Sequence, residues 1–106
     1  MSKLVYICAP YSGDIEKNIE QANKYAKFVY RHGFIPIAPH NLFPFIKNET
    51  SEEERKWALF ADLAVLEKCD ILVLCSKELT AGMRAEVEYA NEHDIRVTFL
   101  DDIEEA

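Results

Sequence analysis

The residue best suited to chemistry is Glu86, which lies near the start of a predicted helix. Residues 71–75 form an apolar run, and the segment 80–90 that follows carries Gly82 four residues before Glu86. A buried strand, a short turn with glycine and then a helix is how open α/β sheets place ligands at the carboxyl ends of their strands. A carboxylate in that position can attack a substrate, stabilise a cation or simply face solvent.

Two other turns are expected beside Glu86. Residues 9–13 follow a first apolar run, and residues 39–45 follow a second run and are unusually rich in aromatic side chains. The carboxyl ends of parallel strands meet at one edge of a sheet. These two segments and Gly82 are therefore predicted to bound a single concave pocket that holds the Glu86 carboxylate.

The elements that must position these residues alternate between strand and helix patterns. Pro36 has no N–H to donate, which predicts an edge position for its strand or an early end to it. Ser51 and Glu54 form a capping-box pattern at the start of the second helix. The predicted strands are 4–8, 34–38, 70–75 and 96–100. The predicted helices run from Ile15 to a stop at His32-Gly33, from Ser51 to about Lys68, and from Thr80 to about His93. The second helix is expected to place Trp57, Phe60, Leu63 and Ala64 on one face, and residues 101–106 are expected to form an acidic tail.

This alternation predicts the fold class. A βαβαβαβ order indicates an α/β protein with a doubly wound parallel sheet, helices on both faces and right-handed crossovers. The chain has 106 residues, enough for one small domain, and 49% of them are hydrophobic, which is typical of a globular core. Residues 1–106 are therefore expected to form a single domain.

Composition excludes several function classes. The net charge of −7 argues against a nucleic-acid polymer as partner, because such a partner needs a basic surface. No apolar segment is long enough to span a bilayer, and the N-terminus lacks the layout of a signal peptide, so we expect no membrane partner and a cytoplasmic location. Cys8, Cys69 and Cys75 lack C-x-x-C spacing and are expected to be buried, reduced thiols. The three histidines lack the spacing of metal ligands and no G-x-G-x-x-G is present, so neither a metal nor another cofactor is expected.

Three ordered motifs resemble those of the nucleoside 2-deoxyribosyltransferase superfamily. The family's opening strand and turn look like residues 6–10, and its aspartate-leucine pair in the middle helix looks like Asp62-Leu63, followed by a strand that begins at Asp70. Its signature glycine, glutamate and apolar-x-x-Ala sequence matches Gly82, Glu86 and residues 87–90. The resemblance covers nearly the whole chain, and residues 35–44 are similar to a small bacterial and phage branch. It implies a flavodoxin-like domain of the deoxyribosyltransferase type.

The resemblance implies cleavage or transfer at the N-glycosidic bond of a (deoxy)nucleoside or a nucleoside 5′-monophosphate. Glu86 would be the nucleophile, and Asp62 would supply a proton or bind the base, a pairing of carboxyl groups that suits glycosidic chemistry. Aromatic side chains of the turns could stack on the base. The substrate-binding candidates are Tyr6, Ala9, Pro10, Tyr11, His40, Phe43, Thr80, Gly82 and Arg84, and Phe45 is a further candidate for stacking.

The sequence also favours a phosphate over a free nucleoside. Where family members often carry an aspartate that holds the sugar 5′-hydroxyl, this chain has Thr80, a neutral donor at a helix N-terminus that favours anions, with Arg84 one turn further on. Glu88 and the net charge oppose that preference. The resemblance further implies a homo-oligomer, a dimer or larger, in which a neighbouring chain completes the pocket.

Several alternatives remain open at this point. The chain could be a non-catalytic nucleotide-binding or sensing protein on the same fold, or an oligomeric scaffold without a small ligand. Individual residues have plainer interpretations as well: Asp62 could face solvent, His40 could pack a loop and Arg84 could pair with Glu88 at i+4. The aromatic residues of the loop could belong to the core or to a subunit interface.

Overall fold

The computed structural model describes residues 3–46 and 51–106. Its four strands form one parallel sheet in the order β2-β1-β3-β4, which is the strand order of a flavodoxin-like sheet. The strands are β1 (Leu4–Cys8), β2 (Ile35–Ile37), β3 (Ile71–Leu74) and β4 (Arg96–Phe99). β2 is an edge strand in which Pro36 lies opposite Val5, so the edge position predicted from the proline is confirmed.

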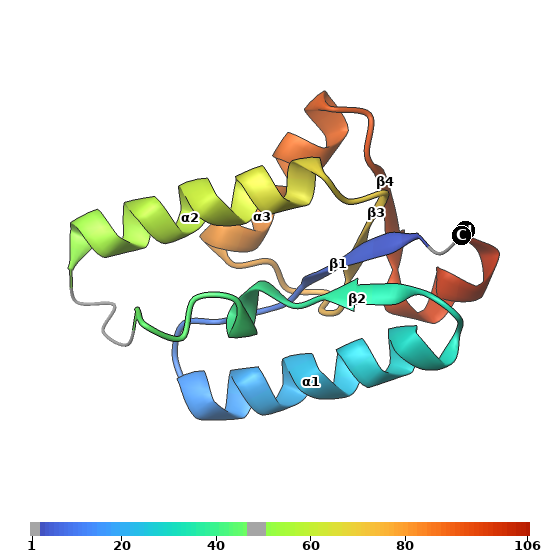
Figure 1. Ribbon diagram of the computed structural model, residues 1–106, viewed down its shortest axis with the longest axis horizontal. Helices are drawn as coiled ribbons and strands as arrows, with labels where there is room; N and C mark the ends of the chain where they lie inside the picture. Colours follow the sequence, from blue (N-terminus) through green and yellow to red (C-terminus); the bar gives the residue numbers. More distant parts are fainter. Residues whose placement is uncertain (1–2, 47–50) are drawn as a thin grey trace.

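Helices cover both faces of this sheet (Figure 1). α1 (Ile15–Arg31) packs on one face, and α2 (Glu52–Glu67) and α3 (Ala81–Glu92) pack on the other. Two short 3-10 helices complete the fold, η1 (Pro39–Asn41) after β2 and η2 (Leu100–Glu105) after β4. The predicted doubly wound α/β class is confirmed. No helix in residues 3–46 and 51–106 is long and apolar enough to cross a membrane.

The core lies on both sides of β1 and β3 because strand side chains alternate between faces. Tyr6 and Cys8 point toward α2 and α3, where they pack with Leu72 and Met83. Val5 and Ile7 point toward α1 and pack with its Val29 and other residues of that face. These four of the five β1 side chains are fully buried. The continuous apolar pattern of this strand follows from its central position in a sheet covered on both faces.

Each long helix begins at a side-chain cap that the sequence contains. Asp14 accepts a hydrogen bond from the Lys17 amide at 3.2 Å, and Ser51 accepts one from the Glu54 amide at 3.3 Å. Thr80 accepts from the Met83 amide at 3.2 Å. These bonds satisfy amides that the first turn of a helix leaves without an intrahelical partner.

The face expected for α2 differs from the observed one. Trp57, Phe60 and Ala64 are exposed, and Phe60 keeps 70% of its surface accessible. Leu63 does pack against the core, and the residues that the helix buries are Ala61 and Leu66. The N-terminal half of α2 extends beyond the strands (Figure 1), so this part of the helix has no sheet beneath it.

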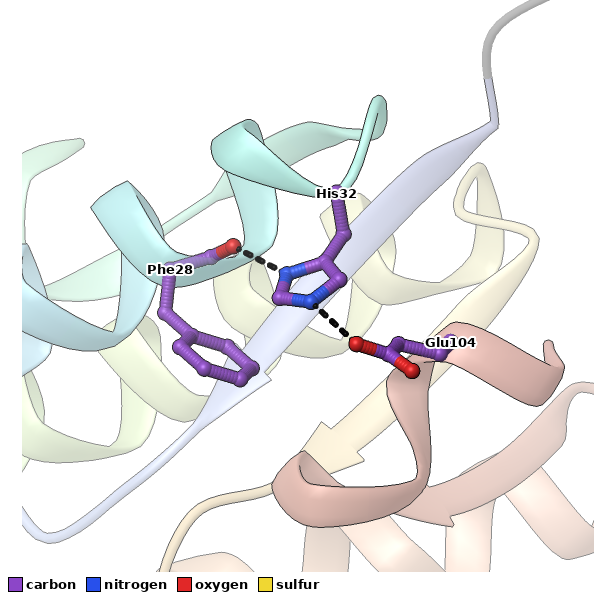
Figure 2. A network of polar contacts seen from close by, with 3 residues as sticks. All are labelled: Phe28, His32 and Glu104. Atoms are coloured by element: carbon purple, nitrogen blue, oxygen red, sulfur yellow. Dashed lines mark hydrogen bonds and ion pairs between the residues drawn. The ribbon is translucent and has the colours of Figure 1, made fainter.

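The C-terminal residues are not a free acidic tail. They form η2, which folds back so that Ile103 is fully buried in the core cluster on the α1 face. His32 at the end of α1 connects to this segment: its Nδ1 lies 2.8 Å from the Phe28 carbonyl oxygen and its Nε2 lies 3.0 Å from Oε1 of Glu104 (Figure 2). Both ring nitrogens face acceptors, so the doubly protonated ring satisfies both contacts.

Candidate active site

A pocket of about 490 Å³ opens where the carboxyl ends of β1, β2 and β3 meet. Its volume lies within the range of small-molecule sites. Residues after each of the three strands contribute to it, as the sequence predicted. The lining residues are Ala9, Tyr11, Ser12, Pro39, His40, Phe43, Ile46, Glu54, Arg55, Ala58, Leu59, Asp62, Thr80, Ala81, Gly82, Met83 and Glu86.

Glu86 is buried at the base of this pocket, with 7% of its surface exposed. Two donors on β1 contact its two carboxylate oxygens. The Tyr6 hydroxyl donates to Oε2, and the Cys8 thiol lies 3.4 Å from Oε1. The two β1 side chains point to the same face of the sheet because they are two residues apart. The Glu86 carboxylate therefore extends from α3 and is held by hydrogen bonds from two β1 side chains.

The protonation state of Glu86 results from opposing effects. Burial raises its pKa to about 6, while the hydrogen bonds from Tyr6 and Cys8 act to lower it. The pKa values of both donors are themselves raised, first by burial and then by the charge of Glu86. Both donors therefore keep their protons near neutral pH. In this range Glu86 is mainly an ionised carboxylate held by two neutral donors.

Asp62 has a different proton affinity in the same pocket. It lies on α2, and its pKa is raised to about 7, chiefly by burial and further by the negative charge of Glu86. Near neutral pH this carboxyl group therefore keeps its proton far more readily than an ordinary aspartate. Two carboxyl groups whose environments separate their pKa values can act as an acid and a nucleophile at one site. Asp62 is partly buried and lines the pocket.

His40 joins two of the pocket's turns. It is buried, and its Nε2 lies 2.8 Å from the Pro10 carbonyl oxygen, so Nε2 carries the proton that this bond needs. Burial lowers the pKa of His40, partly opposed by the carbonyl groups of Pro10 and Ala9, and the ring is neutral. Its edge contacts Tyr11, with the ring centroids 5.5 Å apart. His40 thus packs the loop and lines the pocket at once.

The first turn of α3 forms another part of the pocket wall. Thr80 uses its side-chain oxygen to cap the helix, and its hydroxyl proton remains for a second contact. A Cβ added at Gly82 would meet nothing closer than the Thr80 hydroxyl oxygen, at 3.9 Å. Packing therefore does not require glycine there, and its missing side chain leaves the pocket open beside Glu86.

Two sequence candidates lie outside the pocket. Arg84 is exposed and lines a separate groove on α3 with Val87 and Glu88. It lies two residues before Glu86, which places it about 200° away around the helix. Phe45 keeps 69% of its surface exposed and packs beside Phe43 and Trp57, at centroid distances of 6.2 and 6.1 Å, rather than facing the pocket. Of the remaining candidates, Ala9, Tyr11, His40, Phe43, Thr80 and Gly82 line the pocket, while Tyr6 contacts Glu86 and Pro10 contacts His40.

The wall formed by α2 was not predicted. Glu54, Arg55 and Ala58 line the pocket on the same side of the helix as Asp62. They lie eight, seven and four residues before Asp62, the spacing of one helical face. Projection of this spacing back from Asp62 would have found them. Ser12 and Pro39 belong to the two segments that were predicted to bound the pocket, whereas Ile46, Leu59, Ala81 and Met83 were missed. In the part of the chain that the structure describes, no cluster of three or more His, Cys, Asp or Glu could hold a metal ion.

Comparison with known families identifies the chain. Residues 3–100 match the family described as a domain of unknown function, DUF7768. The chain belongs to this family. No curated protein sequence matches it. The family's description leaves the chemistry to be inferred from the site.

Solved structures share the fold of this DUF7768 domain. A 2-deoxyribosyltransferase from the psychrotolerant bacterium Bacillus psychrosaccharolyticus matches with a TM-score of 0.70 and 17% identity, over 91% of this chain and 70% of that one. A 2-deoxyribosyltransferase from Leishmania mexicana matches with a TM-score of 0.66 and 17% identity, over 92% of this chain and 63% of that one. The fold is therefore of the nucleoside 2-deoxyribosyltransferase type, as the sequence motifs indicated.

Proposed function

We propose that this DUF7768 domain cleaves or transfers at the N-glycosidic bond of a nucleoside, with Glu86 as the nucleophile. The observation that carries the proposal is the buried carboxylate of Glu86, held by donors from β1 at the base of a pocket that Asp62 also lines. The similar fold of two 2-deoxyribosyltransferases supports it. An ionised carboxylate and a partly protonated one are the two groups that a retaining glycosidic reaction needs.

The reaction follows from these two states. The Glu86 carboxylate attacks the sugar carbon that carries the base, and the C–N bond breaks as the new C–O bond forms. Asp62 gives its proton to the departing base. A water molecule, or a second base, then attacks the same carbon and loses a proton to Asp62, which releases Glu86 as a carboxylate. Water yields hydrolysis, and a second base yields transfer.

The charges of the pocket bear on the choice between a nucleoside and its 5′-monophosphate. Among the described lining residues, Glu54, Asp62 and Glu86 are acidic and Arg55 is basic. Arg84, which supported a phosphate in the sequence, lies outside. Thr80 and the first turn of α3 still offer donors. We propose the uncharged nucleoside as the preferred substrate, because a phosphate would meet more negative than positive charge.

We also propose that the protein forms a homo-oligomer through the exposed side of α2. Phe45, Trp57 and Phe60 are exposed there, and Leu59 is partly exposed while also lining the pocket. An apolar patch of this kind is unfavourable in water and is typical of a protein interface. A second copy packed on this patch would lie beside the pocket and exclude water from one of its walls.

The test is a panel of ribo- and deoxynucleosides and their 5′-monophosphates, assayed by chromatography for release or exchange of the free base. Wild-type protein should release base, and Glu86→Gln should lose at least a hundredfold in rate, because the amide cannot attack. Glu88→Gln is the matched control, since Glu88 is exposed on the same helix outside the pocket. Binding without base release from any substrate would refute the catalytic proposal and favour the non-catalytic nucleotide-binding alternative.

A further inference from the structure

Cys8 makes a contact that the proposed reaction does not itself require. Its side chain is fully buried on β1, and its thiol lies 3.4 Å from Oε1 of Glu86 and 3.9 Å from the Met83 carbonyl oxygen. The other two thiols lie near carbonyl oxygens of Val65 and Val73. Among the hydrogen bonds found in residues 3–46 and 51–106, Cys8 is the cysteine that contacts a carboxylate.

We propose that Cys8 is a positioning residue that donates its thiol proton to Oε1 of Glu86 and so orients the carboxylate and favours its charged form. The inference rests on the proposed role of Glu86 as nucleophile. Tyr6 occupies Oε2, so the thiol is the donor that fixes the second oxygen. With each oxygen held, the carboxylate cannot rotate freely about its Cγ–Cδ bond. Its plane is then set before a substrate enters.

The surroundings of Cys8 keep it a thiol. Burial, the charge of Glu86 and the hydrogen bond to Glu86 all raise the Cys8 pKa, and Cys75, which follows β3, adds to this. A thiol that does not ionise cannot compete with Glu86 as the anion of the site. The titratable groups that act on Glu86 and its donors are Tyr6 and Cys8 from β1, Asp62 from α2 and Cys75 after β3.

The experiment measures the Glu86 pKa directly, by ¹³C carboxyl NMR of protein labelled at glutamate, with the resonance assigned from Glu86→Gln. Cys8→Ala removes the donor and should raise the Glu86 pKa by roughly half a unit, since thiol donors are weak. Cys8→Ser retains a donor and should restore the wild-type value or lower it. Cys75→Ala is the matched control and should leave the Glu86 pKa unchanged, because Cys75 packs in the opposite core cluster.

A second measurement needs no change at Cys8. In the Cys75→Ala protein, the Raman S–H stretching band of Cys8 should move to lower frequency as pH rises through the Glu86 titration, because an ionised carboxylate is the stronger acceptor. The Cys69 band should stay fixed. A Cys8 band that ignores this titration would overturn the proposal, as it would show that the proton points to Met83.

The outcomes separate this inference from the proposed function. An unchanged Glu86 pKa in Cys8→Ala, or equal rises in the alanine and serine variants, overturns the positioning role even where base release is observed. A raised pKa in Cys8→Ala with rescue by serine supports the role even where no nucleoside reacts. Where base release is observed, the acidic limb of its pH profile should shift in Cys8→Ala with the NMR value, which a purely structural change would not produce.

Discussion

Replacement of Asp62 by asparagine should stabilise this protein, and the gain should grow as pH rises. Burial and the Glu86 charge raise the folded-state pKa of Asp62 from 3.8 to about 7. An acid whose folded pKa is raised binds more protons in the folded state. Its contribution to stability is therefore favourable at low pH and is lost as pH rises from the unfolded value through the folded one. The neutral amide of asparagine carries no such cost.

The magnitude follows from the pKa difference. Three units at about 1.36 kcal/mol each correspond to a cost on the order of 4 kcal/mol once Asp62 is fully ionised. Between pH 5 and pH 8 the linkage relation gives a change of roughly 2–3 kcal/mol. Urea unfolding of wild type and Asp62→Asn at these two pH values should show the variant gaining by about that amount. The difference between the two pH values cancels the pH-independent effects of the substitution.

Two results would refute this reasoning about Asp62. A gain that is the same at pH 5 and pH 8 would show that the carboxyl group titrates normally in the folded state. A loss of stability that deepens with pH would show that its charged form is stabilised by a partner. Glu88→Gln, at an exposed position on α3, is the control and should show little difference between the two pH values. If the Asp62→Asn protein is more stable but no longer releases base, the carboxyl group that lowers the stability of the fold is also the one that the reaction requires.

Three further outcomes are expected. Tyr6→Phe removes the donor to Oε2 and should raise the Glu86 pKa by about one to two units, since hydrogen bonds to charged groups contribute about 1.5–3 kcal/mol. NMR and a shift of the acidic limb of the pH–rate profile would both show this change, and an unshifted pKa would contradict the contact. Glu104→Gln should destabilise the protein at pH 6 and not at pH 9 in urea unfolding. The reason is that the His32 pKa is raised, first by the Phe28 carbonyl and then by Glu104, and this stabilisation is lost as pH rises through that pKa. Phe60→Glu should shift the protein toward monomer in light scattering without loss of helicity, and a wild-type protein that is already monomeric at high concentration would rule out the interface.

Local sequence patterns determined the elements and much of the pocket. The apolar run of β1, the capping side chains of Asp14, Ser51 and Thr80 and the proline of β2 act within a strand or one helical turn, so their consequences can be predicted without the rest of the chain. The position of the pocket could also be predicted from the sequence. In a doubly wound sheet the turns that follow parallel strands lie at the same edge, so the three turns were expected to meet there.

What only the tertiary structure decided is the environment of each side chain. Tyr6 precedes Glu86 by 80 positions in the sequence, and Cys8 precedes it by 78. No local pattern therefore reveals that these two residues are the hydrogen-bond donors to Glu86. The raised pKa of Asp62 likewise depends on the burial of its side chain and on the charge of Glu86 on α3, and Trp57 is exposed although helical spacing alone allowed it to be buried. Burial and charge act through space, and the long-range packing of α2, α3 and β1 sets the distances over which they act.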